Sequence, residues 1–124
     1  PRSIEPVRAD FKPVGKGVLQ ATIPAPAGGD LRIIVQQYAG DGTLLRTFAG
    51  DASMGKVFQL QAEQNGHPIP IHEDYDRVIW SGLSWAAGEV SEKDLQPRSP
   101  LTITFRTTEK SAATLRGNLY RVRY

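Results

Sequence analysis

The 124-residue chain contains no cysteine. Disulfide bridges, a thiolate nucleophile and cysteine-ligated zinc or iron–sulfur sites are therefore excluded. Stability must come from apolar burial and backbone hydrogen bonds, and a chain of this length buries enough surface to fold without covalent staples. We expect one domain with one core.

Long apolar runs and an excess of one charge are also missing. No segment approaches the roughly 20 apolar residues that cross a bilayer, and residues 1–6 lack the apolar centre of a signal peptide. The 15 basic residues oppose 13 acidic ones, a formal charge of +2, which gives no broad basic field for nucleic acid. We expect a soluble chain without a membrane span or a nucleic-acid partner. Pro1 also fits the removal of an initiator methionine, which favours cytoplasmic synthesis.

Glycine and proline are frequent instead, with 12 and 9 copies spread along the chain. They divide it into short segments separated by turns, which is typical of all-β proteins. The one helical signal is the cap-like spacing of Ser91 to Asp94, which predicts a single turn.

Alternating apolar and polar residues predict the strands. In the strongest of them Leu31, Ile33 and Val35 share one face, while Arg32 and Gln36 lie on the other. The expected strands are residues 18–23, 31–38, 43–48, 57–64, 67–71, 78–85 with a bulge at Gly82, 101–106 and 119–124.

Two dipeptides predict hairpins. Asp41-Gly42 and Asn65-Gly66 are both typical of type I′ turns, in which both central residues have positive φ. The return strand of the second hairpin contains Pro68 and Pro70, so it is expected to be an edge strand or an irregular strand. The Gly-Glu-Val segment at residues 88–90, which follows the bulged strand, is expected to form a loop.

This pattern predicts an all-β fold, an antiparallel β-sandwich or jelly roll of about seven or eight strands, because each apolar face needs a second sheet to cover it. A small β-barrel is the alternative. Residues 1–17, rich in proline and glycine, are expected as an extended N-terminal arm, and residues 18–124 as a single domain.

A catalytic serine is not predicted. Residues 82–86 partly match the nucleophile elbow of α/β-hydrolases around Ser84, but Ala86 occupies the position of the second glycine and no helix is expected to follow.

Metal ligands are present only as fragments. His67 and His72 lack a helical zinc motif, and Glu73, Asp74 and Asp76 supply only part of a calcium loop. We therefore predict no catalytic residue, no metal site and no cofactor.

The end of the chain is basic, and Tyr120 and Tyr124 alternate with Arg121 and Arg123. We interpret this pattern as one strand with its tyrosines packed and its arginines in water, since acids elsewhere cancel the field that nucleic acid needs.

These features together predict a non-enzymatic structural or binding module that docks on copies of itself or on a larger assembly. Virion proteins such as phage capsid decoration or tail components are built in this way, which is an analogy of design. The arm and the last strand would extend a neighbour's sheet or clamp across its surface. The expected partner-binding residues are Phe11, Val14, Tyr120, Arg121, Arg123 and Tyr124.

The alternative is a carbohydrate-binding module. An exposed indole stacks on the apolar face of a sugar ring, and neighbouring carboxylates bind its hydroxyl groups. Trp80 or Trp85 would provide the platform, with Asp74 and Asp76 beside it.

Overall fold

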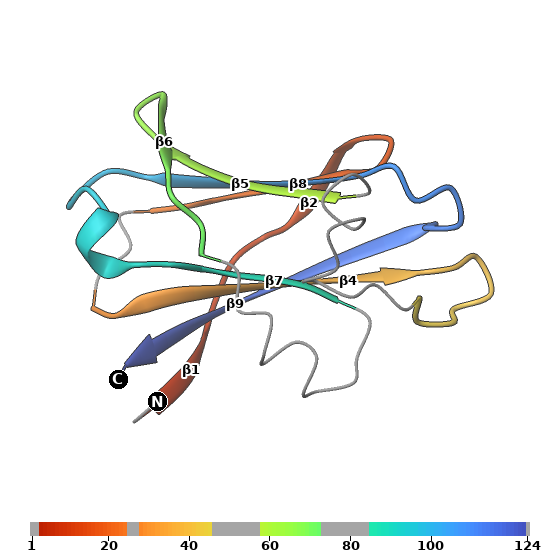
Figure 1. The fold of residues 1–124 in the computed structure, drawn as a ribbon, viewed down its shortest axis with the longest axis horizontal. Helices are drawn as coiled ribbons and strands as arrows, with labels where there is room; N and C mark the ends of the chain where they lie inside the picture. Colours follow the sequence, from red (N-terminus) through yellow and green to blue (C-terminus); the bar gives the residue numbers. More distant parts are fainter. Residues whose placement is uncertain (1–2, 25–27, 46–57, 73–84, 124) are drawn as a thin grey trace.

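The computed structural model describes residues 3–24, 28–45, 58–72 and 85–123 (Figure 1). This part of the chain is almost entirely β, as the alternating pattern predicts, with one short 3-10 turn, η2 (Glu92–Asp94). The strands are β1 (Ser3–Val7), β2 (Lys12–Gly15), β3 (Val18–Ile23), β4 (Asp30–Tyr38), β5 (Phe58–Gln64), β6 (His67–Ile69), β7 (Trp85–Val90), β8 (Leu101–Thr107) and β9 (Thr114–Arg123).

The strands form two antiparallel sheets that pack face to face (Figure 1). One sheet has the order β1-β9-β4-β7, and the other has the order β2-β3-β8-β5-β6. The predicted β-sandwich is confirmed, and the described strands do not close into a barrel. The count exceeds the expected seven or eight because β1 and β2 come from the segment expected to be an arm.

The core lies between the sheets and is built from the predicted alternation. Leu31, Ile33 and Val35 on β4 are at most 1% exposed, while the intervening residues of that strand are only half-buried. Ile103 and Phe105 on β8 are fully buried opposite them. Because successive side chains of a strand point to opposite faces, one sequence pattern fixes both the core and the outer faces.

The N-terminal segment joins the two sheets. β1 pairs with β9 from Ser3 opposite Arg123 to Val7 opposite Leu119, and β2 pairs with β3 in the other sheet. Residues 8–11 cross between them. Ser3 and Arg123 are therefore side by side at one end of the sandwich, where Figure 1 places both ends of the chain.

The Asn65-Gly66 hairpin is confirmed. Asn65 and Gly66 have φ angles of 52° and 77°, as a type I′ turn requires, and β6 is the edge strand that its proline predicts.

The Asp41-Gly42 turn is not of the predicted type. Gly42 has a φ of 86°, but Asp41 is not in the positive region. The amide of Gly42 donates to the carbonyl of Ala39, so the turn is centred on Gly40 and Asp41, and Gly42 follows it as a bulge residue. The preceding Gly40 allows the chain to turn one residue earlier than expected. The expected return strand is described only at its start, where Leu44 bridges to Tyr38 of β4 and the Leu45 amide donates to the Gln37 carbonyl. Residues 46–48 lie outside the described part.

The loop expected at residues 88–90 is wrong, because these residues belong to strand β7. Glycine weakens a strand on average, yet Gly88 is required here by packing: a Cβ at this position would lie 2.5 Å from Cγ2 of Ile71. The expected strand at residues 78–84 and its bulge lie outside the described residues.

The turn expected at Ser91 to Asp94 is confirmed as η2, although Ser91 does not cap it with its side chain. The Glu92 amide instead donates to Oδ1 of Asp30, at 2.8 Å, from the start of β4. The turn is thereby attached to the first sheet.

Candidate binding grooves

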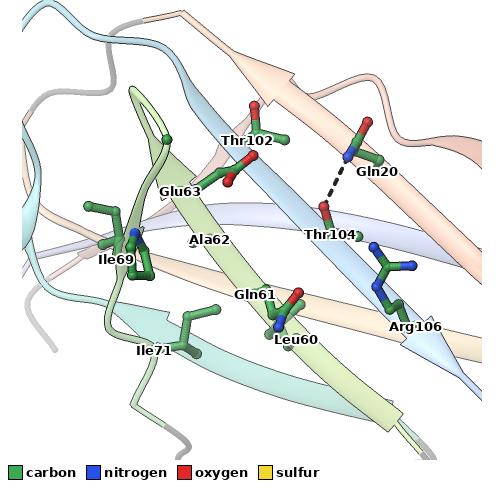
Figure 2. Close-up of a pocket in the computed structure, with 12 residues that line it drawn as sticks. Gln20, Leu60, Gln61, Ala62, Glu63, Ile69, Ile71, Thr102, Thr104 and Arg106 are labelled. Atoms are coloured by element: carbon green, nitrogen blue, oxygen red, sulfur yellow. Dashed lines mark hydrogen bonds between the residues drawn. The ribbon is translucent and has the colours of Figure 1, made fainter.

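A polar groove lies on the outer face of the five-stranded sheet (Figure 2). It has a volume of about 430 Å³. Strand register brings its central side chains together, because Gln20 on β3 and Gln61 on β5 are both opposite Thr104 on β8. The polar residues that line it are Gln20, Gln61, Glu63, Thr102, Thr104 and Arg106.

Hydrogen bonds hold part of this face in place. Nε2 of Gln20 donates to the hydroxyl of Thr104 at 3.0 Å, the dashed line in Figure 2, and Thr102 shares a hydrogen bond with Thr22. Glu63 and Arg106 add one charge of each sign on either side of this central row. The groove therefore offers donors, acceptors and balanced charge, which suit a neutral polar ligand.

A second groove, of about 480 Å³, lies where the N-terminal segment crosses between the sheets. It exists because β1 covers only part of β9: their pairing stops at Leu119, whereas β9 pairs with β4 as far as Thr114. The crossover forms one wall of the groove and the uncovered part of β9 forms the other. Its lining residues are Ala9, Asp10, Phe11, Lys12, Gln36, Leu115, Arg116, Gly117 and Asn118.

The expected partner-binding residues are distributed over both sides of this region. Phe11 is half-buried and packs against the core, while Val14 on β2 is 56% exposed. Tyr120 and Arg121 on β9 are half-buried. Arg123 forms an ion pair with Glu5 on β1, at 3.0 Å; Tyr124 lies outside the described residues.

The last strand is not free to add to a neighbour's sheet along its whole length. Its second half lies between β1 and β4, so both of its edges are paired there. Strand addition by the end of β9, as expected from the sequence, is therefore excluded by its position in the sheet.

The structure does not test the expected carbohydrate residues. Asp74, Asp76 and Trp80 lie outside the described residues, as does Ser84. Trp85 begins β7 opposite Gln36, and only its backbone is described.

The two histidines are not brought together with a set of acids. His67 starts β6, and Nε2 of His72 lies 3.8 Å from Oδ2 of Asp94 on η2. The nearby Glu89 carboxylate accepts hydrogen bonds from Arg32 at 2.7 and 3.0 Å. Among the described residues no group of three potential ligands is placed to hold a metal ion.

Sequence reasoning missed both grooves. The first groove has a partial signal in the sequence, because Gln20, Thr104 and Gln61 are polar members of predicted strands. Their alignment, however, depends on which strands are neighbours in the sheet. The second depends on the residue at which β1 leaves β9, and no local pattern marks that point.

No protein-family model, curated protein or solved structure matches this chain. No helix in the described part of the chain is long and apolar enough to cross a membrane.

Proposed function

We propose that the chain is a non-enzymatic module that docks on a larger assembly through its N-terminal flank, which comprises β1, the crossover at residues 8–11, β2 and the stretch of β9 beside the crossover. The observation that carries this proposal is the stretch of β9, Thr114–Asn118, that no described strand covers on the side of β1, beside the 480 Å³ groove. A strand edge with no neighbour offers unpaired amide and carbonyl groups to another chain.

Three outer strands carry features that hinder pairing with another chain, unlike the uncovered stretch of β9. β1, β2 and β6 contain Pro6, Pro13 and Pro68, and β2 also carries a bulge. Proline and bulges protect sheet edges against pairing with other chains. The uncovered stretch of β9 has neither, so it is a described edge that is open to a partner.

Exposed apolar side chains support the same flank. In the described part of the chain, the exposed large apolar residues are Ile4 on β1 and Val14 on β2, at 49% and 56%. Each would gain roughly 1 kcal/mol from losing its remaining water-exposed area to a partner. A virion subunit, such as a phage capsid decoration or tail component, is the finer form of this proposal.

Charge substitutions on the flank test it. The tagged chain is mixed with an extract of its source, and its complexes are sized by size-exclusion chromatography with light scattering. The Ile4→Asp/Val14→Asp variant should lose the wild-type complex, self-assembled or mixed, because a carboxylate would be buried in the interface.

Pro70→Asp is the matched control, since it places an acid on an exposed residue after β6, away from the flank. Circular dichroism verifies that each variant is folded. A complex that is the same size in all three proteins argues against docking through this flank, and turnover abolished by Ser84→Ala would argue against a non-enzymatic role.

The polar groove of Figure 2 favours a second candidate, carbohydrate binding, because hydroxyl and amide groups match those of a sugar. A glycan array followed by calorimetry tests it. Binding weakened by Gln61→Ala points to the groove, and binding weakened only by Trp80→Ala or Trp85→Ala points to indole stacking. No signal for any glycan removes this candidate.

A further inference from the structure

We call the stretch of β9 that β1 does not pair with, Thr114–Asn118, the open half-edge. The strand position beside it, in line with β1, is called the lane. Pairing of β1 with β9 is antiparallel and ends at Val7 opposite Leu119. Among the described strands, only β4 pairs with the open half-edge, from its other side. In an antiparallel ladder the residues alternate in which neighbour they bond, so about two or three residues of this stretch direct their amide and carbonyl groups toward the empty lane.

The crossover at residues 8–11 lies along one side of the lane. Gly117 packs so closely on Phe11 that a Cβ there would lie 2.5 Å from Cγ of the ring. Phe11 itself packs against the core. The crossover is therefore fixed beside β9 by an apolar contact and is not paired with it as a strand.

The size of the lane suits a short extended segment. At about 3.4 Å per residue, the open half-edge accommodates a strand of roughly 17 Å. Side chains of such a strand would alternate between Leu115 and Gly117 on the inner side and Arg116 and Asn118 on the outer side, because paired residues of neighbouring strands share a face.

The charges beside the lane favour an acidic segment. Lys12 and Arg116 line the groove with Asp10, which leaves one net positive charge. The Arg116 guanidinium lies 5.3 Å from the centre of the Tyr38 ring, which orients it on the outer face of the sheet. A carboxylate on the added strand opposite Arg116 would form a cross-strand ion pair.

We infer that the open half-edge binds an extended, acidic peptide segment of the docking partner as an added antiparallel strand in line with β1. This inference rests on the proposed docking function and names the chemistry that the partner presents. The backbone ladder supplies affinity, and Arg116 with Lys12 supplies selection for acids.

Selection from a library of random nine-residue peptides displayed on phage, with the folded chain as the target, provides the first test. The enriched peptides should alternate acidic with apolar or small residues. The best one is synthesised with a fluorophore, and its Kd is measured by fluorescence anisotropy against variants of the chain.

Arg116→Glu should raise the Kd at least tenfold, and Lys12→Glu severalfold. Arg98→Glu is the matched control, because it makes the same change on an exposed arginine that lines neither groove, and it should leave the Kd unchanged. A peptide with alternate backbone amides N-methylated should lose binding, and amide exchange measured by NMR should slow within Thr114–Asn118.

Several results overturn the inference. These are no enriched peptide, peptides rich in basic residues, an equal loss in Arg98→Glu, and slowed exchange at another edge. Dimers of the chain with the same protected amides would assign the lane to a second copy instead. If peptide binding fails while Ile4→Asp/Val14→Asp still abolishes the complex, docking stands and only the strand-addition mode falls.

Discussion

At Gly117 the crossover lies in close contact with β9. Its hypothetical Cβ would lie 2.5 to 2.8 Å from three atoms of the Phe11 ring, which is closer than side-chain atoms approach in folded proteins. A side chain at this position would therefore displace the ring and the crossover with it.

We expect Gly117→Ala to lower the free energy of unfolding by about 1–3 kcal/mol, the usual range for overpacking. Urea unfolding followed by circular dichroism measures this change. Gly40→Ala is the control, since a Cβ there meets nothing within 4 Å and should have little effect. Equal effects of the two substitutions would contradict the close contact.

Asp41 stabilises the turn after β4 through its charged form. The Thr43 hydroxyl and then the Thr43 amide, which donates to Oδ1 at 2.9 Å, hold the pKa of the Asp41 carboxyl below its ordinary value of 3.8. Because the folded-state pKa is the lower one, this contribution is complete above about pH 4. It is lost as the pH falls through the folded-state pKa.

An NMR titration of the Asp41 carboxyl carbon should therefore give a midpoint below 3.8 in the folded protein. Thr43→Val, which removes the hydroxyl but keeps the amide, should move the midpoint upward part of the way. A midpoint at or above the ordinary value would show that these hydrogen bonds do not favour the carboxylate.

At the scale of elements, β5 is joined to the loop before β8 by one buried amide. Gln64 is 1% exposed. Its Nε2 donates to the carbonyls of Gln96 and Ser99, at 3.1 and 3.0 Å, and its Oε1 accepts the Gln96 amide at 2.7 Å. The side chain thus satisfies backbone groups that belong to no sheet.

We expect Gln64→Leu to destabilise the protein by about 2–4 kcal/mol, because it leaves several backbone groups buried without partners. Urea unfolding measures the total, and amide exchange should accelerate first at Gln96. Gln61→Leu, at an exposed position of the same strand, is the control. A loss of unfolding free energy no larger than that of the control would mean that water replaces the hydrogen bonds of Gln64.

Strands were predictable from the sequence where alternation is regular. β3 matches its expected bounds of 18–23, and β4 and β8 differ by only a residue at an end, because their apolar faces are continuous. β5 fills the described part of its expected range, residues 58–64. β7 was not predictable in its second half, since Gly88 contributes no apolar signal and is selected by contact with Ile71 from another element.

The grooves were less predictable than the strands. Register and strand order decide which side chains meet, and both are set by contacts between residues far apart in sequence. Val14 was named from the sequence and is exposed, whereas Phe11 was named with it and packs on Gly117. The sequence does not distinguish Val14 from Phe11, because each is an apolar residue in a proline-rich segment.

For the whole molecule, the N-terminal segment supplies an outer strand to each sheet. β1 and β2 lie at the ends of the two strand orders, and Val7 and Phe11 pack against the core between them. The segment is thus part of the sandwich as well as the proposed docking flank.

We expect a chain that lacks residues 1–15 to lose about 3 kcal/mol or more of its unfolding free energy, because two partly buried apolar side chains and two strand pairings are removed. Urea unfolding measures this loss. It also means that truncation confounds folding with docking, so point substitutions are the sharper test of the flank. A truncated chain with an unchanged midpoint would show that the segment is dispensable for folding.

The pairing of Ser3 with Arg123 has a mechanical consequence. A force that pulls these two residues apart loads the β1–β9 ladder from one end, so its hydrogen bonds carry the tension one after another and not jointly. Each is worth only about 1 kcal/mol net in water. A tether at this end would peel β1 away at low force, and the rest of the sandwich would experience little strain until the peeling reached Phe11.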